Sequence, residues 1–360
     1  MASVGLIANP GASHDLRRLT SLARTIGVHE RANAVARLLG GLVASGIDTV
    51  WYMPEPAGVV EQAVEFLAAA DGLAAHSRLP VLRPVLDQPA LDAAGTARAA
   101  AAMARAGVAC LVTHGGDGTH RAAVSGWPEA VIVPLAGGTN NALALLIEPT
   151  AAGLAAGLFA AHPARHGEHV RRVPRLEVRA GAPDRADQVA LVDVALLAGA
   201  SVGARAIWDA GLLLEAVVAR SDPTLTGLAG AAGMVSPLPA GCGPASAPGP
   251  PLAVHLRFGS SGRTVRVPLG PGQFVPIGVE SARRAGAGET IELGDRDRLG
   301  ADGWRTVAFD GERELVLAPG ERAEVRLVAD GPFVLDAAGL LRAAADAGDL
   351  GRLGGTEERR

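Results

Sequence analysis

Two short apolar runs, each followed by a glycine-rich loop, constrain the fold of this chain most strongly. Residues 108–113 (VACLVT) lead into GGDGT at 115–119, and residues 131–135 (VIVPL) lead into GGTNN at 137–141. Apolar runs without a polar face are typical of strands buried on both sides in a parallel sheet. Because ligands bind at the carboxyl ends of such strands, we expect both loops at one edge of the sheet, in a ligand site.

The rest of the chain falls into two patterns. Residues 1–150 alternate short apolar strands with amphipathic helices, which predicts an α/β nucleotide-binding domain with a mostly parallel sheet. Residues 151–333 carry short β-rich runs separated by turn residues, which predicts a mainly antiparallel second domain, interrupted by a helix at 202–220. Residues 334–360 are predicted to form a helix that packs back on the first domain, followed by a frayed tail.

Composition and charge exclude several classes of protein. A net charge of -4 argues against a nucleic-acid binder. No apolar stretch is long enough to span a membrane, and the N-terminus lacks the pattern of a signal peptide, so a cytoplasmic protein without a membrane or nucleic-acid partner is expected. All 33 basic residues are arginines, which excludes a Schiff-base lysine and a Walker A lysine.

The loop Gly115-Gly116-Asp117-Gly118-Thr119 carries the clearest chemistry. Glycines let backbone N–H groups approach phosphate oxygens closely, and the start of the following helix adds unpaired N–H groups and a partial positive charge. Asp117 would repel a phosphate, so it is better explained as a ligand of Mg²⁺ or as the acceptor of a proton from an attacking hydroxyl. The alternative is a tight turn in which Asp117 or Thr119 caps the helix.

The second loop offers a further set of small polar groups. Gly137 and Gly138 free the backbone, and Thr139, Asn140 and Asn141 place short polar side chains at a helix start. Asn9, in the turn after the first strand, is a third candidate at the same edge. His114 and His120 flank the first loop, and for them packing or capping is favoured over phosphate binding.

These motifs resemble a known superfamily. The segments IANPG, GGDGT, GGTNNAL and FDGERE are similar to those of the superfamily that joins ATP-NAD kinases with diacylglycerol and sphingosine kinases. Within it, the chain most resembles the ATP-NAD kinase-like proteins associated with acetoin catabolism, through HERANAVARLLGGL, LVDVAL, ARAIWD and TLTGLAGAAGM. The matching segments extend from residue 4 to about residue 336.

The resemblance implies a nucleotide-binding α/β domain, a β-sandwich-like acceptor-binding domain and an active site in the cleft between them. It implies ATP and Mg²⁺ as cofactors, with Asp117 as catalytic base or orienter of the acceptor hydroxyl. The D-G-E motif of the lipid-kinase branch matches Asp310-Gly311-Glu312, so Asp310 and Glu312 are predicted catalytic carboxylates. Asn9, the loop glycines, Thr119 and Thr139 are then assigned to phosphate, and relatives are commonly homo-oligomers.

One position departs from the pattern of NAD kinases. Their dinucleotide-recognising Asn-acid pair aligns with Val192-Asp193, and a valine cannot supply the hydrogen bonds of an asparagine. Asp193, the acid of this pair, is assigned to acceptor binding, together with Asn140 and Asn141 of the second loop. The leading hypothesis is an Mg²⁺-dependent phosphotransferase that uses ATP, or polyphosphate, on a hydroxyl acceptor, with NAD as the leading acceptor. The alternative is a non-catalytic nucleotide sensor of acetoin metabolism, and a lipid or sphingoid kinase ranks third.

Overall fold

The computed structural model describes most of the chain. The described residues are 2–12, 21–23, 25–69, 79–138, 141–181, 187–199, 209–238, 251–295, 303–311 and 313–350. Of the predicted site residues, Thr139, Asn140 and Glu312 lie outside these ranges.

The first part of the structure is built on a seven-stranded sheet with the order β3-β2-β1-β4-β5-β17-β6. All its pairings are parallel except that of β6 with β17. Because β6 and β17 belong to this sheet, it takes in residues on both sides of position 150. Its strands are β1 (Ser3–Ala8), β2 (Thr49–Tyr52), β3 (Val81–Pro84), β4 (Cys110–Gly115), β5 (Val131–Ala136), β6 (Val170–Arg172) and β17 (Phe333–Leu335).

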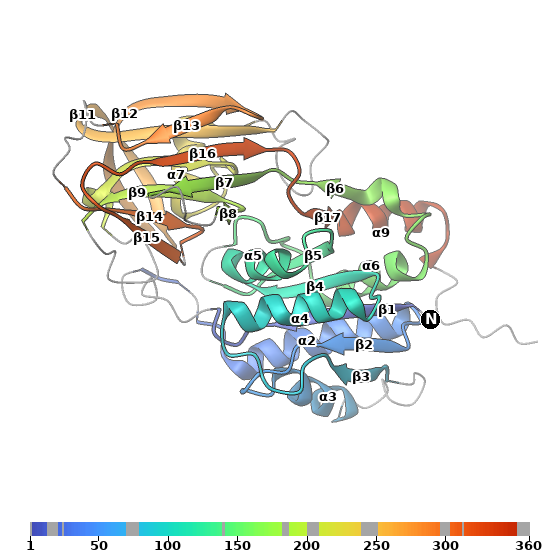
Figure 1. The fold of residues 1–360 in the computed structure, drawn as a ribbon. Coiled ribbons are helices and arrows are strands. Elements are labelled where there is room, and N and C mark those ends of the chain that lie inside the picture. The colour runs from blue at the N-terminus through green and yellow to red at the C-terminus, as the bar shows by residue number, and fades with distance from the viewer. Residues whose placement is uncertain are drawn as a thin grey trace, which may run out of the picture.

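Helices cover both faces of this sheet (Figure 1). On one face, α2 (Val28–Ala44), α3 (Val59–Ala69), α6 (Pro149–Ala161) and α9 (Ala337–Asp346) share a buried apolar cluster with Leu6, Val112 and Val133. On the other face, α4 (Ala93–Arg105) and α5 (Asp117–Gly126) pack with Ile7, Leu111 and Ile132. Strands with apolar residues on both sides are therefore buried on both sides, as the runs at 108–113 and 131–135 predicted. None of the described helices combines the length and the apolar character needed to cross a bilayer.

The second part consists of two antiparallel sheets that share a buried apolar core. A four-stranded sheet has the order β13-β16-β7-β8, and a six-stranded sheet has the order β12-β11-β10-β9-β14-β15. Leu176 and Val325 of the smaller sheet pack with Val194 and Phe309 of the larger one. Helix α7 (Gly227–Val235) and Val254 of the six-stranded sheet belong to the same cluster as Ile7 and Leu111 of the first part.

The strands of these two sheets are β7 (Arg175–Ala180), β8 (Gln188–Ala190), β9 (Asp193–Ala198), β10 (Leu213–Val218), β11 (Leu252–Gly270), β12 (Gln273–Gly286), β13 (Thr290–Leu293), β14 (Arg305–Phe309), β15 (Arg313–Leu317) and β16 (Ala323–Val328). Two single-turn helices, η1 (Gly167–His169) and η2 (Ala210–Leu212), complete the described elements. The predicted fold class is confirmed: an α/β part with a mostly parallel sheet, followed by an antiparallel β part.

The helix predicted at 202–220 is wrong over its described residues. Residues 201–208 are outside the described part, but Leu213–Val218 form β10, paired with both β9 and β11. A short apolar run does not distinguish a buried helix from a buried strand by periodicity alone. Here pairing with two neighbouring strands decides in favour of the strand.

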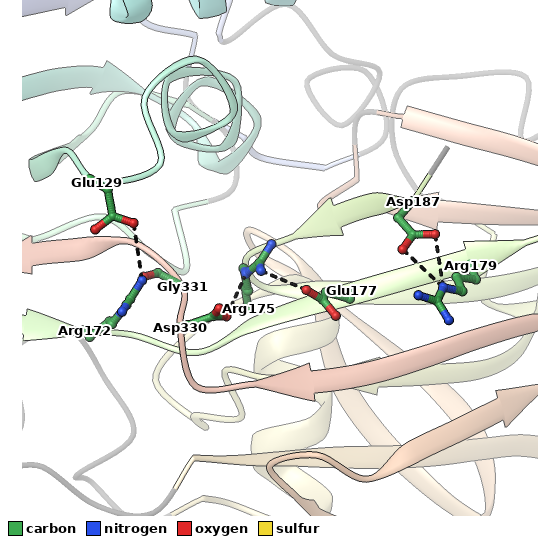
Figure 2. Close-up of polar contacts among 8 residues, drawn as sticks. All are labelled: Glu129, Arg172, Arg175, Glu177, Arg179, Asp187, Asp330 and Gly331. Atoms are coloured by element: carbon green, nitrogen blue, oxygen red, sulfur yellow. Dashed lines mark hydrogen bonds and ion pairs between the residues drawn. The ribbon is translucent and has the colours of Figure 1, made fainter. Parts of the chain in front are cut away.

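The two parts are joined by a pair of adjacent chain segments, 172–175 and 328–333. Val173 N donates to Pro332 O at 3.0 Å, which continues the pairing between the sheets. Figure 2 shows that Arg172 donates to the Gly331 carbonyl (3.1 Å) and lies near Glu129 (3.5 Å), while Arg175 pairs with Asp330 and Glu177. A Cβ atom on Gly331 would lie 2.2 Å from a carbonyl oxygen of the facing segment, so this close approach requires glycine.

Candidate functional site

The two glycine loops lie against each other at the carboxyl edge of the parallel sheet. β4 ends at Gly115 and α5 begins at Asp117, while β5 ends at Ala136 beside it. Gly137 N donates to Gly115 O at 2.8 Å, and a Cβ atom on Gly138 would lie 2.5 Å from Gly116 Cα. The sequence prediction that both loops meet at one edge is therefore correct, and glycine at 138 is what allows the contact.

Asp117 joins the first loop to the segment that follows the second. Its side chain is buried, and its two carboxylate oxygens accept hydrogen bonds from Ala142 N and Leu143 N, each at 2.9 Å. Burial raises the pKa of Asp117 to about 7, against the opposing effect of these two N–H donors. A carboxyl group with a pKa near neutrality can exchange a proton at physiological pH, as a general base must.

A cleft of about 510 Å³ opens beside the first loop. Asn9, Gly118 and Thr119, all predicted phosphate-binding residues, line it, and Asn9 Nδ2 donates to Thr119 Oγ1 at 2.9 Å. Its wall also includes the apolar residues Met53, Pro56, Ala57, Ala90 and Leu91. The other predicted glycines, Gly115, Gly116, Gly137 and Gly138, support the loops and are not among the residues that line this cleft, and neither is the buried Asp117, which precedes the lining residue Gly118.

Asn141 is engaged within its own loop. Its amide oxygen accepts from Gly138 N at 3.0 Å and its amide nitrogen donates to Gly138 O at 2.8 Å. This arrangement is a closed local turn. Acceptor binding by Asn141 would require these bonds to be exchanged.

The second part of the molecule contributes Asp310 to the same region. Asp310 has a positive φ of 48°, and its carboxylate accepts from Leu191 N, Val192 N and Asp193 N at 2.8–3.2 Å. Burial raises its pKa, whereas Arg121 and the three N–H donors act in the opposite direction. Asp193 is buried, and the Val192 side chain lies fully in the apolar core, so it faces no ligand.

Three arginines at the site were missed in the sequence. Arg121 of α5 lies 3.4 Å from Asp310 (Nε to Oδ2), and the positive charge of Arg220 lowers the pKa of Asp117. Arg31 is fully buried in α2 and donates twice to Gly137 O, at 3.1 Å. A sequence signal exists for Arg31, because it lies on the apolar stripe that Val35, Leu38 and Leu42 form at helical spacing.

The two histidines beside the first loop are buried. His120 Nδ1 lies 2.7 Å from Thr113 Oγ1, and burial lowers the pKa of His114 and of His120 to about 3, so both rings are neutral at pH 7. His114 also borders a second hollow, of about 300 Å³, with Ile26, Leu145 and Ile147. Neither ring therefore supplies a positive charge that could bind a phosphate.

Magnesium would have few protein ligands here. Among the described residues no group of three or more metal-ligating side chains is found, and both oxygens of Asp117 already accept backbone N–H groups. Mg²⁺ bound with a nucleotide is commonly held by phosphate oxygens and water, with few carboxylates. The few available side chains therefore fit a Mg²⁺ ion that binds together with ATP, rather than one coordinated mainly by protein ligands.

Known proteins resemble the chain in sequence and in fold. The model of the acetoin catabolism protein X C-terminal domain matches residues 174–330. Acetoin catabolism protein X of Cupriavidus necator is 35% identical over 331 residues, which cover 90% of this chain and 87% of that protein.

Two solved structures from Bacillus anthracis str. Sterne are similar to the chain in fold. One is of a diacylglycerol kinase, and the other is of a protein assigned to that class only provisionally. Their TM-scores are 0.41 and 0.43 at 14% and 13% identity, over 93% of this chain and 96% of each of theirs. Overlaps at this level carry no argument about activity. The sequence identity does settle the family: the chain belongs to the acetoin catabolism protein X family.

Proposed function

We propose that this protein binds ATP in the cleft beside Gly118 and Thr119 and transfers its terminal phosphoryl group to a hydroxyl acceptor. The observation that carries the proposal is the cleft itself, whose wall combines apolar side chains with the start of α5 at the carboxyl edge of a parallel sheet. The apolar side chains, such as Met53 and Leu91, suit a nucleobase. The start of α5 suits phosphates because N-terminal N–H groups of a helix favour anions.

In the transfer step, the acceptor oxygen forms a bond to the terminal phosphorus as the bond to the ADP oxygen breaks. The hydroxyl proton passes to a base, and Asp117, with a pKa of about 7, is the base that we assign. Mg²⁺ bound with ATP would offset negative charge on the phosphates. The protein's own contribution is to orient the reactants and to provide fixed dipoles, which usually dominate phosphoryl transfer.

NAD is the leading acceptor, so the product would be NADP. Asp193, Asn140 and Asn141 remain the proposed acceptor-binding residues, and Glu312 a proposed catalytic carboxylate. The Cupriavidus relative is named as a protein of acetoin catabolism, and we extend this metabolic setting to the present chain as part of the proposal.

The test is NADP formation by the purified protein from ATP, Mg²⁺ and NAD, followed through an NADP-specific dehydrogenase. Asp117→Asn is the matched variant, and its folding must be measured in parallel because Asp117 also holds Ala142 and Leu143. We expect a signal that the variant loses while still folded. A folded variant with full activity would remove Asp117 from the reaction.

A second candidate function is that of a nucleotide sensor without catalysis. The observation that favours it is the position of Val192, whose side chain is buried in the apolar core and offers nothing to a dinucleotide. Tight binding of ATP or NAD, with no phosphate transfer to any acceptor tried, would support this alternative.

A further inference from the structure

Arg121 is the basic residue in the wall of the cleft. Among the described residues that line the cleft, it alone carries a positive charge and Asp92 alone a negative one. The Asp92 side chain accepts a hydrogen bond from Gly95 N as the cap of α4, so it is already engaged. Since the chain has no lysine and no histidine is among the described residues that line the cleft, Arg121 is the side-chain cation available to a phosphate there.

The position of Arg121 on α5 places it close to the glycine loop that lines the cleft. It follows Gly118 by three residues on the same helix, and residues three apart share a helix face. Gly118, Thr119 and Arg121 all line the cleft, together with Asn9. The cation therefore lies beside the helix start where phosphate is proposed to bind.

Asp310 holds this arginine from the second part of the molecule. The ion pair joins Arg121 Nε to Asp310 Oδ2 at 3.4 Å, with the two side chains 6% and 0% exposed. Arg121 Nε is buried and has no hydrogen-bond partner among the described residues, so its contact with Asp310 is an ion pair without hydrogen-bond geometry. Asp310 is itself fixed by the N–H groups of Leu191, Val192 and Asp193, so it can orient the arginine without moving.

We propose that Arg121 is the side chain that binds the phosphate groups of the nucleotide, and that Asp310 is a positioning residue that orients it. This inference rests on the proposed function. Guanidinium groups bind phosphate through paired, charge-assisted hydrogen bonds, which are about twice as strong as neutral ones. Because Asp310 lies after β14, phosphate binding by the first part of the molecule depends on a residue of the second.

The experiment compares the affinities of the full-length protein for ATP and for adenosine by calorimetry. In Arg121→Gln we expect ATP affinity to fall about 10–100-fold, the effect of losing a charge-assisted hydrogen bond. Adenosine affinity should be unchanged, because adenosine carries no phosphate. Asp310→Asn alone should weaken ATP binding less than Arg121→Gln does, because the cation remains.

The double variant Arg121→Gln/Asp310→Asn separates binding from folding. Arg121→Gln leaves a buried carboxylate without its partner, which lowers stability, and the added Asp310→Asn substitution removes that carboxylate. The double variant should therefore melt closer to the wild type, yet bind ATP as weakly as Arg121→Gln.

An equal loss of ATP and adenosine affinity in Arg121→Gln would overturn the inference, and so would recovery of ATP affinity together with stability in the double variant. Full ATP affinity in Arg121→Gln would overturn it while leaving the proposed function intact. A wild-type protein that binds no ATP would instead refute the proposed function, and the inference with it.

Discussion

The buried carboxyl group of Asp117 should make folding less favourable as pH rises. Its pKa is about 7 in the folded protein against an ordinary value of 3.8. Between these values the folded state binds more protons than the unfolded state, so the free energy of unfolding falls with increasing pH. The penalty is complete above pH ~7 and is absent below pH ~4.

The magnitude follows from the two pKa values. The full penalty is about 4 kcal/mol, from a shift of roughly three pKa units at 1.36 kcal/mol each. Between pH 5 and pH 8 the change is about 2–3 kcal/mol. The neutral histidines act in the opposite direction, because the lowered pKa values of His114 and His120, about 3, destabilise the folded state as pH falls below their ordinary range.

A comparison with Asp117→Asn cancels the histidine contributions, since both proteins contain them. Asparagine can accept only one of the two backbone N–H groups, so the variant also carries a pH-independent cost of about 1–3 kcal/mol. Denaturant unfolding at pH 5, 6, 7 and 8 measures the difference between the two proteins. We expect the wild type to lose about 2–3 kcal/mol relative to the variant across this range. A difference that is constant with pH would refute the burial argument for Asp117.

Three other substitutions test the loop contacts and the connection between the two parts. Gly138→Ala places a Cβ atom 2.5 Å from Gly116 Cα; the loops must separate, and we expect weaker ATP binding by calorimetry and a loss of about 1–3 kcal/mol in denaturant unfolding. Arg31→Met leaves the buried Gly137 carbonyl without its two donors, and should cost about 1–3 kcal/mol, whereas an unchanged unfolding midpoint would contradict that role. Gly331→Ala should lower the melting temperature in a thermal scan, because the new methyl group meets the facing backbone, and an unaltered melting curve would show that this approach can relax.

Much of the architecture could be predicted from local patterns. The buried strands before the two glycine loops, and a helix after the first loop, follow from apolar runs and glycine spacing, and the structure contains them. The strand at Leu213–Val218 was mistaken for a helix, because the spacing of its apolar residues does not distinguish a buried strand from a buried helix. Only its pairing with β9 and β11 identifies it as a strand.

The polar contacts of the site could not be read from the sequence. Asp117 accepts hydrogen bonds from backbone groups 25 and 26 residues away, and Asp310 from residues 117 to 119 away. No local spacing encodes such contacts, since they arise only when the chain folds. Arg31 is different, because a charged residue on the apolar stripe of a helix indicates by its position alone that it has a buried polar partner.

The central claim, that the cleft beside Gly118 and Thr119 is the nucleotide site, is tested most directly by photo-crosslinking with 8-azido-ATP and peptide mapping. The wall of the cleft should receive the label, on residues 53–57 or 90–93, and excess ATP should prevent it. Label on residues around the second hollow, at Ile26 or Ile147, or on the β-rich part, would contradict the claim.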